Sequence, residues 1–157
     1  MREIIEKPVV FESTKGGMAL WGVLSLPKSR EKVPAVIAVH GFGGTKSKRK
    51  FVGLGRAFTQ NGIAVLRFDF SGCGDSESEL KNLSVRQEVK DLESAFNFLI
   101  RQPEIDKKKS RVFRGKFRGV DCLSLPGKQS SRKSFSFSCS SLRPEKFNGN
   151  LADPRTD

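Results

Sequence analysis

Two glycine-rich segments hold the side chains of this chain whose types and spacing could do chemistry. The first, His40-Gly41-Phe42-Gly43-Gly44, directly follows the apolar run Ala35–Val39 and contains the one histidine of the sequence. The second, from Asp69 to Ser76, follows another apolar run and contains Cys73 and Asp75. Because ligand sites in open α/β sheets lie at the carboxyl ends of strands, both segments are candidate sites.

Considered one at a time, these residues have simple structural interpretations. A lone His-Gly pair after an apolar run often marks only the end of a strand. Cys73 could be a nucleophile, but the sequence offers no second histidine to activate it, so we expect an unreactive thiol. Asp69 and Asp75 could be acids, and loop capping is the simpler expectation for both.

The chain is basic, with a formal net charge of +12 and a sequence pI of about 10.0. Such a charge can indicate a nucleic-acid or anionic-membrane partner. No interleaving of aromatic and basic residues, zinc-finger spacing or helix-turn-helix pattern accompanies it, so we expect neither a specific nucleic acid nor a membrane as partner. Four basic residues at the start of an expected helix could attract phosphate, although a solvated first turn is the simpler interpretation: Lys46, Lys48, Arg49 and Lys50.

Two features indicate the cellular compartment. The N-terminus, Met-Arg-Glu-Ile-Ile-Glu-Lys, lacks the apolar core of a signal peptide, and no apolar stretch approaches the length of a membrane span. The three cysteines, Cys73, Cys122 and Cys139, form an odd set without metal-ligand spacing. We therefore expect reduced thiols and a cytoplasmic location.

The elements that must position the two segments can be predicted from periodicity. Val9–Ser13 and Met18–Leu26 are β-rich runs on either side of a turn and predict a hairpin. The continuous apolar runs Ala35–Val39 and Ile63–Phe70 are typical of strands buried on both faces of a parallel sheet.

Two helices are expected, one over Lys46–Asn61 and one over Ser84–Gln102. Ser84 and Gln87 have the spacing of a capping box at the start of the second helix. Its expected apolar stripe comprises Val85, Val89, Leu92, Phe96 and Leu99. The order of hairpin, strand, helix, strand and helix predicts an α/β fold, with parallel strands and right-handed crossover helices after a β-hairpin.

The composition changes after Lys107-Lys108-Lys109. Residues 1–109 carry 19 Lys and Arg against 13 Asp and Glu, and residues 110–157 carry 10 against 4, so each part has a net charge of +6. The second part contains nine serines and no periodic apolar segment, with at most a short edge strand around Phe135 and Phe137. We expect an ordered domain over 1–109 and a disordered, Ser/Lys/Arg-rich basic tail over 110–157.

Together, the two segments resemble the α/β-hydrolase family. The segment His40 to Gly44 resembles the family's oxyanion loop, and Asp69 to Ser76 resembles its Asp-x-Arg-Gly-x-Gly-x-Ser segment. Ser71 and Cys73 replace the commoner Arg and His there. The resemblance covers about residues 8 to 109. It implies the N-terminal part of an α/β-hydrolase sheet, and the short length of the chain suggests a truncated enzyme.

The resemblance also implies a reaction and a set of roles. The parent activity would be hydrolysis of carboxylic esters, or else of amides or thioesters, by a Ser-His-Asp triad acting on a small-molecule substrate without metal or organic cofactor. By its place in the motif, the backbone N–H of Phe42 would be one of two donors to the oxyanion. His40, Gly41, Gly43 and Gly44 would support the loop, with His40 as an anchor and not as the catalytic base.

Much of that machinery is missing from the sequence. The family places Gly-x-Ser-x-Gly after the strand that follows the second helix, at roughly residues 113 to 120. The sequence there is Phe113-Arg114-Gly115-Lys116-Phe117-Arg118-Gly119, without a serine, and no histidine follows. The chain is therefore expected to be inactive, with no catalytic residue of its own.

A slipped reading frame would explain the missing serine. Residues 113–119 can be coded TTT AGG GGA AAG TTT AGG GGT, and reading one nucleotide later gives Leu-Gly-Glu-Ser-Leu-Gly. Ser134 to Ser138, coded AGC TTT AGT TTT AGT, becomes the apolar Ala-Leu-Val-Leu. Adenine-rich codons at Lys107–Lys109 offer a place for one extra nucleotide. The alternative is a natural short paralogue whose tail evolved freely.

Two non-enzymatic functions also stay open. A half sheet would expose an edge strand, so the chain could be an interaction fragment that self-associates through that edge. The basic tail could instead bind nucleic acid without sequence specificity, in which case retention on DNA would depend strongly on salt.

Overall fold

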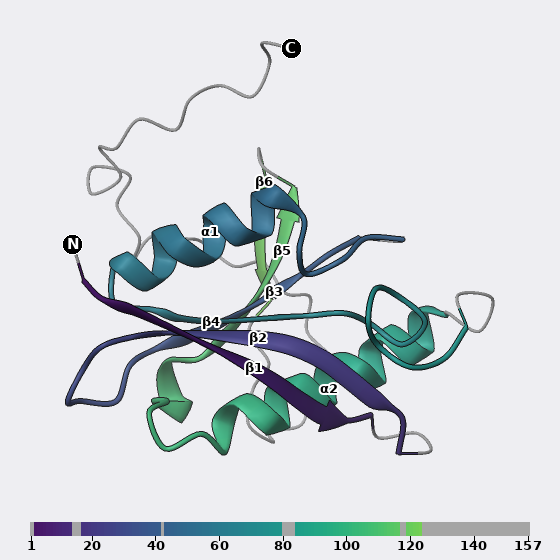
Figure 1. Cartoon of the computed structure of the whole chain (residues 1–157), viewed down its shortest axis with the longest axis horizontal. Coiled ribbons are helices and arrows are strands. Elements are labelled where there is room, and N and C mark those ends of the chain that lie inside the picture. Colours follow the sequence, from purple (N-terminus) through teal and green to yellow (C-terminus); the bar gives the residue numbers. More distant parts are fainter. Residues whose placement is uncertain (1, 14–16, 42, 80–83, 117–118, 124–157) are drawn as a thin grey trace, which may run out of the picture.

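The computed structural model describes residues 2–13, 17–41, 43–79, 84–116 and 119–123, and for 111–116 and 119–123 it describes the backbone (Figure 1). The elements in chain order are β1 (Ile4–Glu12), β2 (Ala19–Pro27), β3 (Ala35–Val39), α1 (Arg49–Gln60), β4 (Ala64–Phe68), α2 (Val85–Ile100), the short 3-10 helix η2 (Lys107–Lys109), β5 (Arg111–Lys116) and β6 (Gly119–Leu123). Within the described residues, neither α-helix is long and apolar enough to cross a membrane.

The described strands form one mixed sheet in the order β1-β2-β4-β3-β5-β6. β3 pairs in parallel with both β4 and β5. β1 with β2, β2 with β4, and β5 with β6 are antiparallel pairs. The predicted hairpin followed by parallel strands is confirmed, and the helices lie on opposite faces of the sheet (Figure 1).

Alternate residues of the central strands supply two separate cores, because successive side chains of a strand point to opposite faces. Val36, Ala38 and Val65 pack with Phe51 and Phe58 of α1 on one face. The larger core on the other face includes Ile37, Val39, Leu66 and Phe68 with Ala95 and Leu99 of α2. Every residue of β3 and β4 is buried, as the continuous apolar runs predicted.

The buried face of α2 differs from the expected apolar stripe. Val85 and Val89 are 77% and 50% exposed, whereas the polar Gln87 and Asp91 are buried. The reason is a hydrogen-bonded cluster beneath the helix: Asp91 Oδ1 accepts from Ser13 Oγ at 2.8 Å and from Gln87 Nε2 at 2.7 Å. Buried polar groups with such partners do not oppose folding as unpaired ones would.

The helix boundaries follow the predicted caps in part. The Ser84 hydroxyl accepts from Gln87 N at 3.2 Å, so Ser84 is the N-cap of α2 as expected. The Gln87 side chain donates to Asp91 and to Ser13. The first helix begins at Arg49, later than the predicted Lys46, which leaves Lys46 in the preceding loop.

The sheet also extends beyond the boundary expected at residue 109. β5 continues it in parallel beside β3, and β6 returns antiparallel to β5. Residues 111–116 and 119–123, which were expected to belong to the basic tail, pair as strands of this sheet. For the other residues of 110–157, the disordered tail stays a prediction. Phe135 and Phe137 lie outside the described residues.

We expect substitutions on α2 to separate its two faces. Leu99→Ala should lower the free energy of unfolding by about 2–5 kcal/mol, because Leu99 is fully buried. The matched change Val89→Ala, at a half-exposed position of the same helix, should alter it by less than about 0.5 kcal/mol. Urea unfolding measures both values, and equal losses would place Val89 in the core and contradict this orientation of the helix.

Candidate functional site

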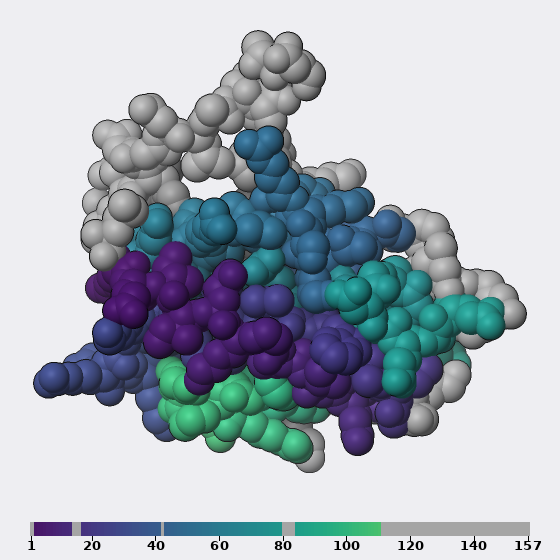
Figure 2. Space-filling model, viewed as in Figure 1, coloured from purple at the N-terminus to yellow at the C-terminus, as the bar shows by residue number. Residues whose placement is uncertain are grey.

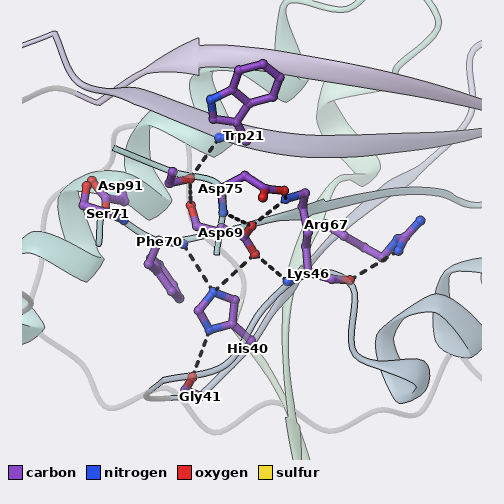
Figure 3. Close-up of polar contacts among 11 residues, drawn as sticks. Trp21, His40, Gly41, Lys46, Arg67, Asp69, Phe70, Ser71, Asp75 and Asp91 are labelled. Atoms are coloured by element: carbon purple, nitrogen blue, oxygen red, sulfur yellow. Dashed lines mark hydrogen bonds and ion pairs between the residues drawn. The ribbon is translucent and has the colours of Figure 1, made fainter. Parts of the chain in front are cut away.

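His40 lies at the carboxyl end of β3 and is 4% exposed. Its Nε2 accepts a hydrogen bond from the backbone N–H of Phe70 at 3.3 Å, and its Nδ1 lies 2.9 Å from the carbonyl oxygen of Gly41. Because the Phe70 amide can only donate, Nε2 must be the unprotonated nitrogen and Nδ1 must carry the proton. Both ring nitrogens are thus engaged by main-chain groups of the two glycine-rich segments (Figure 3).

Steric constraints explain why glycine occupies positions 43 and 44 after His40. Gly43 has a φ of 62°, in the left-handed region that glycine adopts without strain. A Cβ at Gly44 would lie 2.8 Å from the Gly41 carbonyl oxygen and 2.9 Å from His40 Cβ, while the Gly44 amide donates to that same carbonyl at 2.9 Å. The loop is therefore a tight turn that a larger residue at position 44 would disrupt. Phe42, the predicted oxyanion donor, lies outside the described residues.

Cys73 reaches the same loop from the segment after β4. It is buried, and its thiol accepts a hydrogen bond from the Gly43 backbone amide. Burial raises the pKa of the Cys73 thiol above its ordinary value, and the Gly43 bond offsets only part of this effect. A protonated, buried thiol is a poor nucleophile, in agreement with the expected unreactive role.

The carboxylate of Asp69 links the two segments. Asp69 is fully buried, and its Oδ1 accepts from the backbone N–H of Lys46 at 2.5 Å. Its Oδ2 accepts from Lys46 Nζ at 2.5 Å and from the backbone N–H of Asp75 at 3.1 Å. Gly74, with a φ of 52°, passes so close that a Cβ there would collide with this carboxylate. Asp69 and Asp75 thus organise loops, as expected (Figure 3).

Lys46 corrects the expectation of a solvated first helical turn. The residue is 7% exposed, and its Nζ bridges Asp69 and Asp75, with 2.5 Å to Asp75 Oδ2. Burial alone would lower the pKa of Lys46, but the hydrogen bonds and negative charges of Asp69 and Asp75 outweigh it and raise the pKa above its ordinary value. The other three basic residues, Lys48, Arg49 and Lys50, are exposed as expected.

Arg67 is a second buried cation that the apolar pattern of its strand concealed. It is 4% exposed, and its guanidinium donates to Glu6 at 2.9 Å and to the Lys46 carbonyl at 3.3 Å. Gly55 of α1 passes over it, and a Cβ at Gly55 would lie 3.3 Å from Arg67 Nε. Arg67 therefore connects β1 with the loop before α1 and lies close to Gly55 in the middle of that helix.

Ser76 and Ser71 close the segment after β4 onto its neighbours. The Ser76 hydroxyl donates to the Asp69 carbonyl at 2.6 Å and accepts from the Trp21 amide at 2.9 Å. The Ser71 amide donates to Asp91 of α2 at 2.9 Å. The segment is thus fastened to β2 on one side and to α2 on the other.

Most of the predicted site residues lie together at the carboxyl ends of the parallel strands. His40 contacts Phe70, and the Gly43 amide contacts the Cys73 thiol. The parallel register pairs Val39 with Arg114 of β5. Residues 115 and 116 therefore follow beside the start of the His40 loop. Within the described residues, no group of three or more His, Cys, Asp or Glu side chains could hold a metal ion.

We expect the close approach of Gly74 to Asp69 to be sensitive to a single methyl group. Gly74→Ala should lower the free energy of unfolding by at least about 1–2 kcal/mol, from left-handed backbone strain alone, and more if Asp69 moves. Gly53→Ala is the control, since its Cβ would meet nothing within 4 Å, and alanine in a helix should stabilise by up to about 1 kcal/mol. Denaturant unfolding of both variants tests the geometry, and a harmless Gly74→Ala would refute it.

Comparison with known proteins gives relatives that are longer than this chain. No family model matches. Two curated relatives from Escherichia coli, each described as an uncharacterized 31.7 kDa protein in the traX-finO intergenic region, are 31% identical over 93 residues. The match covers 59% of this chain and 32% of each relative, so the chain spans about a third of the curated relatives it matches.

Solved structures give the fold. The α/β hydrolase GrgF from Penicillium sp. sh18 has a TM-score of 0.63 at 25% identity, over 70% of this chain and 37% of that protein. Est1E from Butyrivibrio proteoclasticus, solved with ferulic acid, has a TM-score of 0.60 at 21% identity, over 68% and 41%. Acetyl xylan esterase from Paenibacillus sp. R4 has a TM-score of 0.61 at 18% identity, over 73% and 42%. The chain therefore has the α/β-hydrolase fold and matches the N-terminal portion of that family.

Proposed function

We propose that this chain derives from a serine hydrolase of carboxylic esters and retains the oxyanion loop of that enzyme without its triad. The observation that carries the proposal is the juxtaposition of the His40–Gly44 loop with the carboxyl end of β5. Esterases among the similar structures, such as the acetyl xylan esterase, support an ester as the substrate class.

The hydrogen bonds of the loop favour position 42 as the oxyanion donor. The Gly43 amide donates to the Cys73 thiol, and the Gly44 amide donates to the Gly41 carbonyl. Neither amide is available to a substrate in this arrangement. The backbone N–H of Phe42, between Gly41 and Gly43, is therefore the donor that we propose for the oxyanion.

The register of β5 supports a displaced nucleophile. In the shifted frame, the decoded sequence Gly-Glu-Ser-Leu-Gly would occupy positions 114–118, with its serine at position 116. Arg114 pairs with Val39, the residue before His40. A serine two residues farther along β5 would reach the level of the His40 loop, as an attack on a carbonyl held there requires. The strand register thus agrees with the serine position that this permitted coding gives.

In the parent enzyme, the serine hydroxyl would add to the ester carbonyl carbon while a histidine takes its proton. That proton would then pass to the departing alcohol, and water would hydrolyse the acyl-serine by the same steps. His40 cannot replace that histidine in this arrangement, because the Phe70 amide occupies Nε2 and Nδ1 is turned to Gly41. Loss of nucleophile and base removes about a million-fold of rate in a serine hydrolase, so we propose that the present chain is inactive.

The reading frame and the serine can be tested together. We expect the gene, sequenced across the codons of Lys107–Lys109, to reveal Gly-x-Ser-x-Gly in the frame one nucleotide later. The chain as printed should stay unlabelled by a fluorophosphonate probe, whereas the product of the gene with that nucleotide removed should be labelled and should hydrolyse p-nitrophenyl acetate. Replacing the decoded serine by alanine is the control that should abolish labelling.

Two results would refute this proposal. Covalent labelling of the printed chain at a serine would show that it has a nucleophile of its own. Absence of the Gly-x-Ser-x-Gly motif from the neighbouring frame would remove the displaced nucleophile.

A further inference from the structure

Lys46 engages its surroundings through every polar group that it has. Its backbone N–H and its Nζ both donate to Asp69, its Nζ also contacts Asp75, and its carbonyl accepts from Arg67. Only Thr45 separates it from Gly44, the last residue of the tight turn. The residue is therefore well placed to fix where the loop ends and α1 begins.

The charge of Lys46 also affects His40, because both residues lie close to the carboxylate of Asp69. Asp69 Oδ1 lies 3.9 Å from His40 Nε2, and both side chains are 1% exposed. The hydrogen bond from Phe70 requires that Nε2 stay unprotonated, although a buried carboxylate nearby favours protonation of an imidazole. The Lys46 ammonium, at 2.5 Å from Asp69 Oδ2, supplies the opposite charge to that carboxylate.

We propose that Lys46 is a positioning residue: by pairing with Asp69, it keeps His40 in the neutral tautomer that ties the loop to Phe70 and Gly41. The inference rests on the proposed function, because the loop has a catalytic meaning only if it holds an oxyanion. Without the ammonium, Asp69 draws a proton onto His40 Nε2. The protonated nitrogen can no longer accept from the Phe70 amide, and the loop loses one of its anchors.

His40 is the one histidine of the sequence, so its imidazole nitrogens can be observed by NMR without ambiguity. At pH 7, the wild-type full chain should give Nε2 in the range of an unprotonated ring nitrogen and Nδ1 in the range of a protonated one. In Lys46→Met, and in the milder Lys46→Gln, Nε2 should move to the protonated range, and the Gly44 amide should exchange with solvent about tenfold faster or more.

Matched variants separate the charge effect from general damage. Lys46→Arg retains the charge and should keep the wild-type tautomer. Lys28→Met removes an exposed lysine that pairs with Glu3 at 2.7 Å, and it should leave His40 unchanged. Lys46→Met combined with Asp69→Asn removes both charges, and it should return Nε2 to the unprotonated range.

Each outcome decides the proposal. An unprotonated Nε2 in folded Lys46→Met or Lys46→Gln would overturn it, and so would a protonated Nε2 in the wild type. If neither single variant folds, the double variant decides: an unprotonated Nε2 in its folded state supports the proposal, and a protonated Nε2 overturns it. Failure of the double variant as well would overturn it. The measurement requires no catalysis, so it can fail while the proposed ester hydrolase origin stands, and the reverse also holds.

Discussion

The buried carboxylate of Asp69 is the constraint on which the rest of this structure depends. An ionised carboxylate is stable in a protein interior only when charged or strongly polar partners replace the water it has lost. Asp69 receives them from two directions: Lys46 comes from the loop after β3, and the Asp75 amide comes from the segment after β4. One side chain thereby fixes the relative positions of two segments that are far apart in the sequence.

The parallel sheet explains why those segments meet. β3, β4 and β5 run in the same direction, so their carboxyl ends, with the loops that follow them, lie along one edge. Helices α1 and α2 cover opposite faces and leave that edge to the loops (Figure 1). Figure 2 shows the segment after β4, in teal, lying at the surface beside the end of the first hairpin. The fold thus brings these loops together, and polar contacts between them determine their geometry.

Much of the fold could be predicted because its signals are local. Continuous apolar runs identified β3 and β4, and the Ser84 cap identified the start of α2. The orientation of α2 was missed because a hydrophobic stripe cannot reveal that Asp91 finds partners in Ser13 and Ser71, residues far from it in the chain. Lys46 and Arg67 were missed for the same reason, since their burial depends on Asp69 and Glu6. β5 was missed because it depends on pairing with β3, which the composition of that segment does not indicate.

The most direct test is a double-mutant cycle on the buried pair, in which the free energy of unfolding is measured for Lys46→Met, Asp69→Asn and both together. Breaking a buried ion pair by removing one partner typically costs about 3–5 kcal/mol, because it leaves an uncompensated charge. If Asp69 and Lys46 form the central interaction, the double variant should lose at least about 1 kcal/mol less than the sum of the two single losses. Additivity within about 0.5 kcal/mol would show that the two residues act independently and would contradict the account.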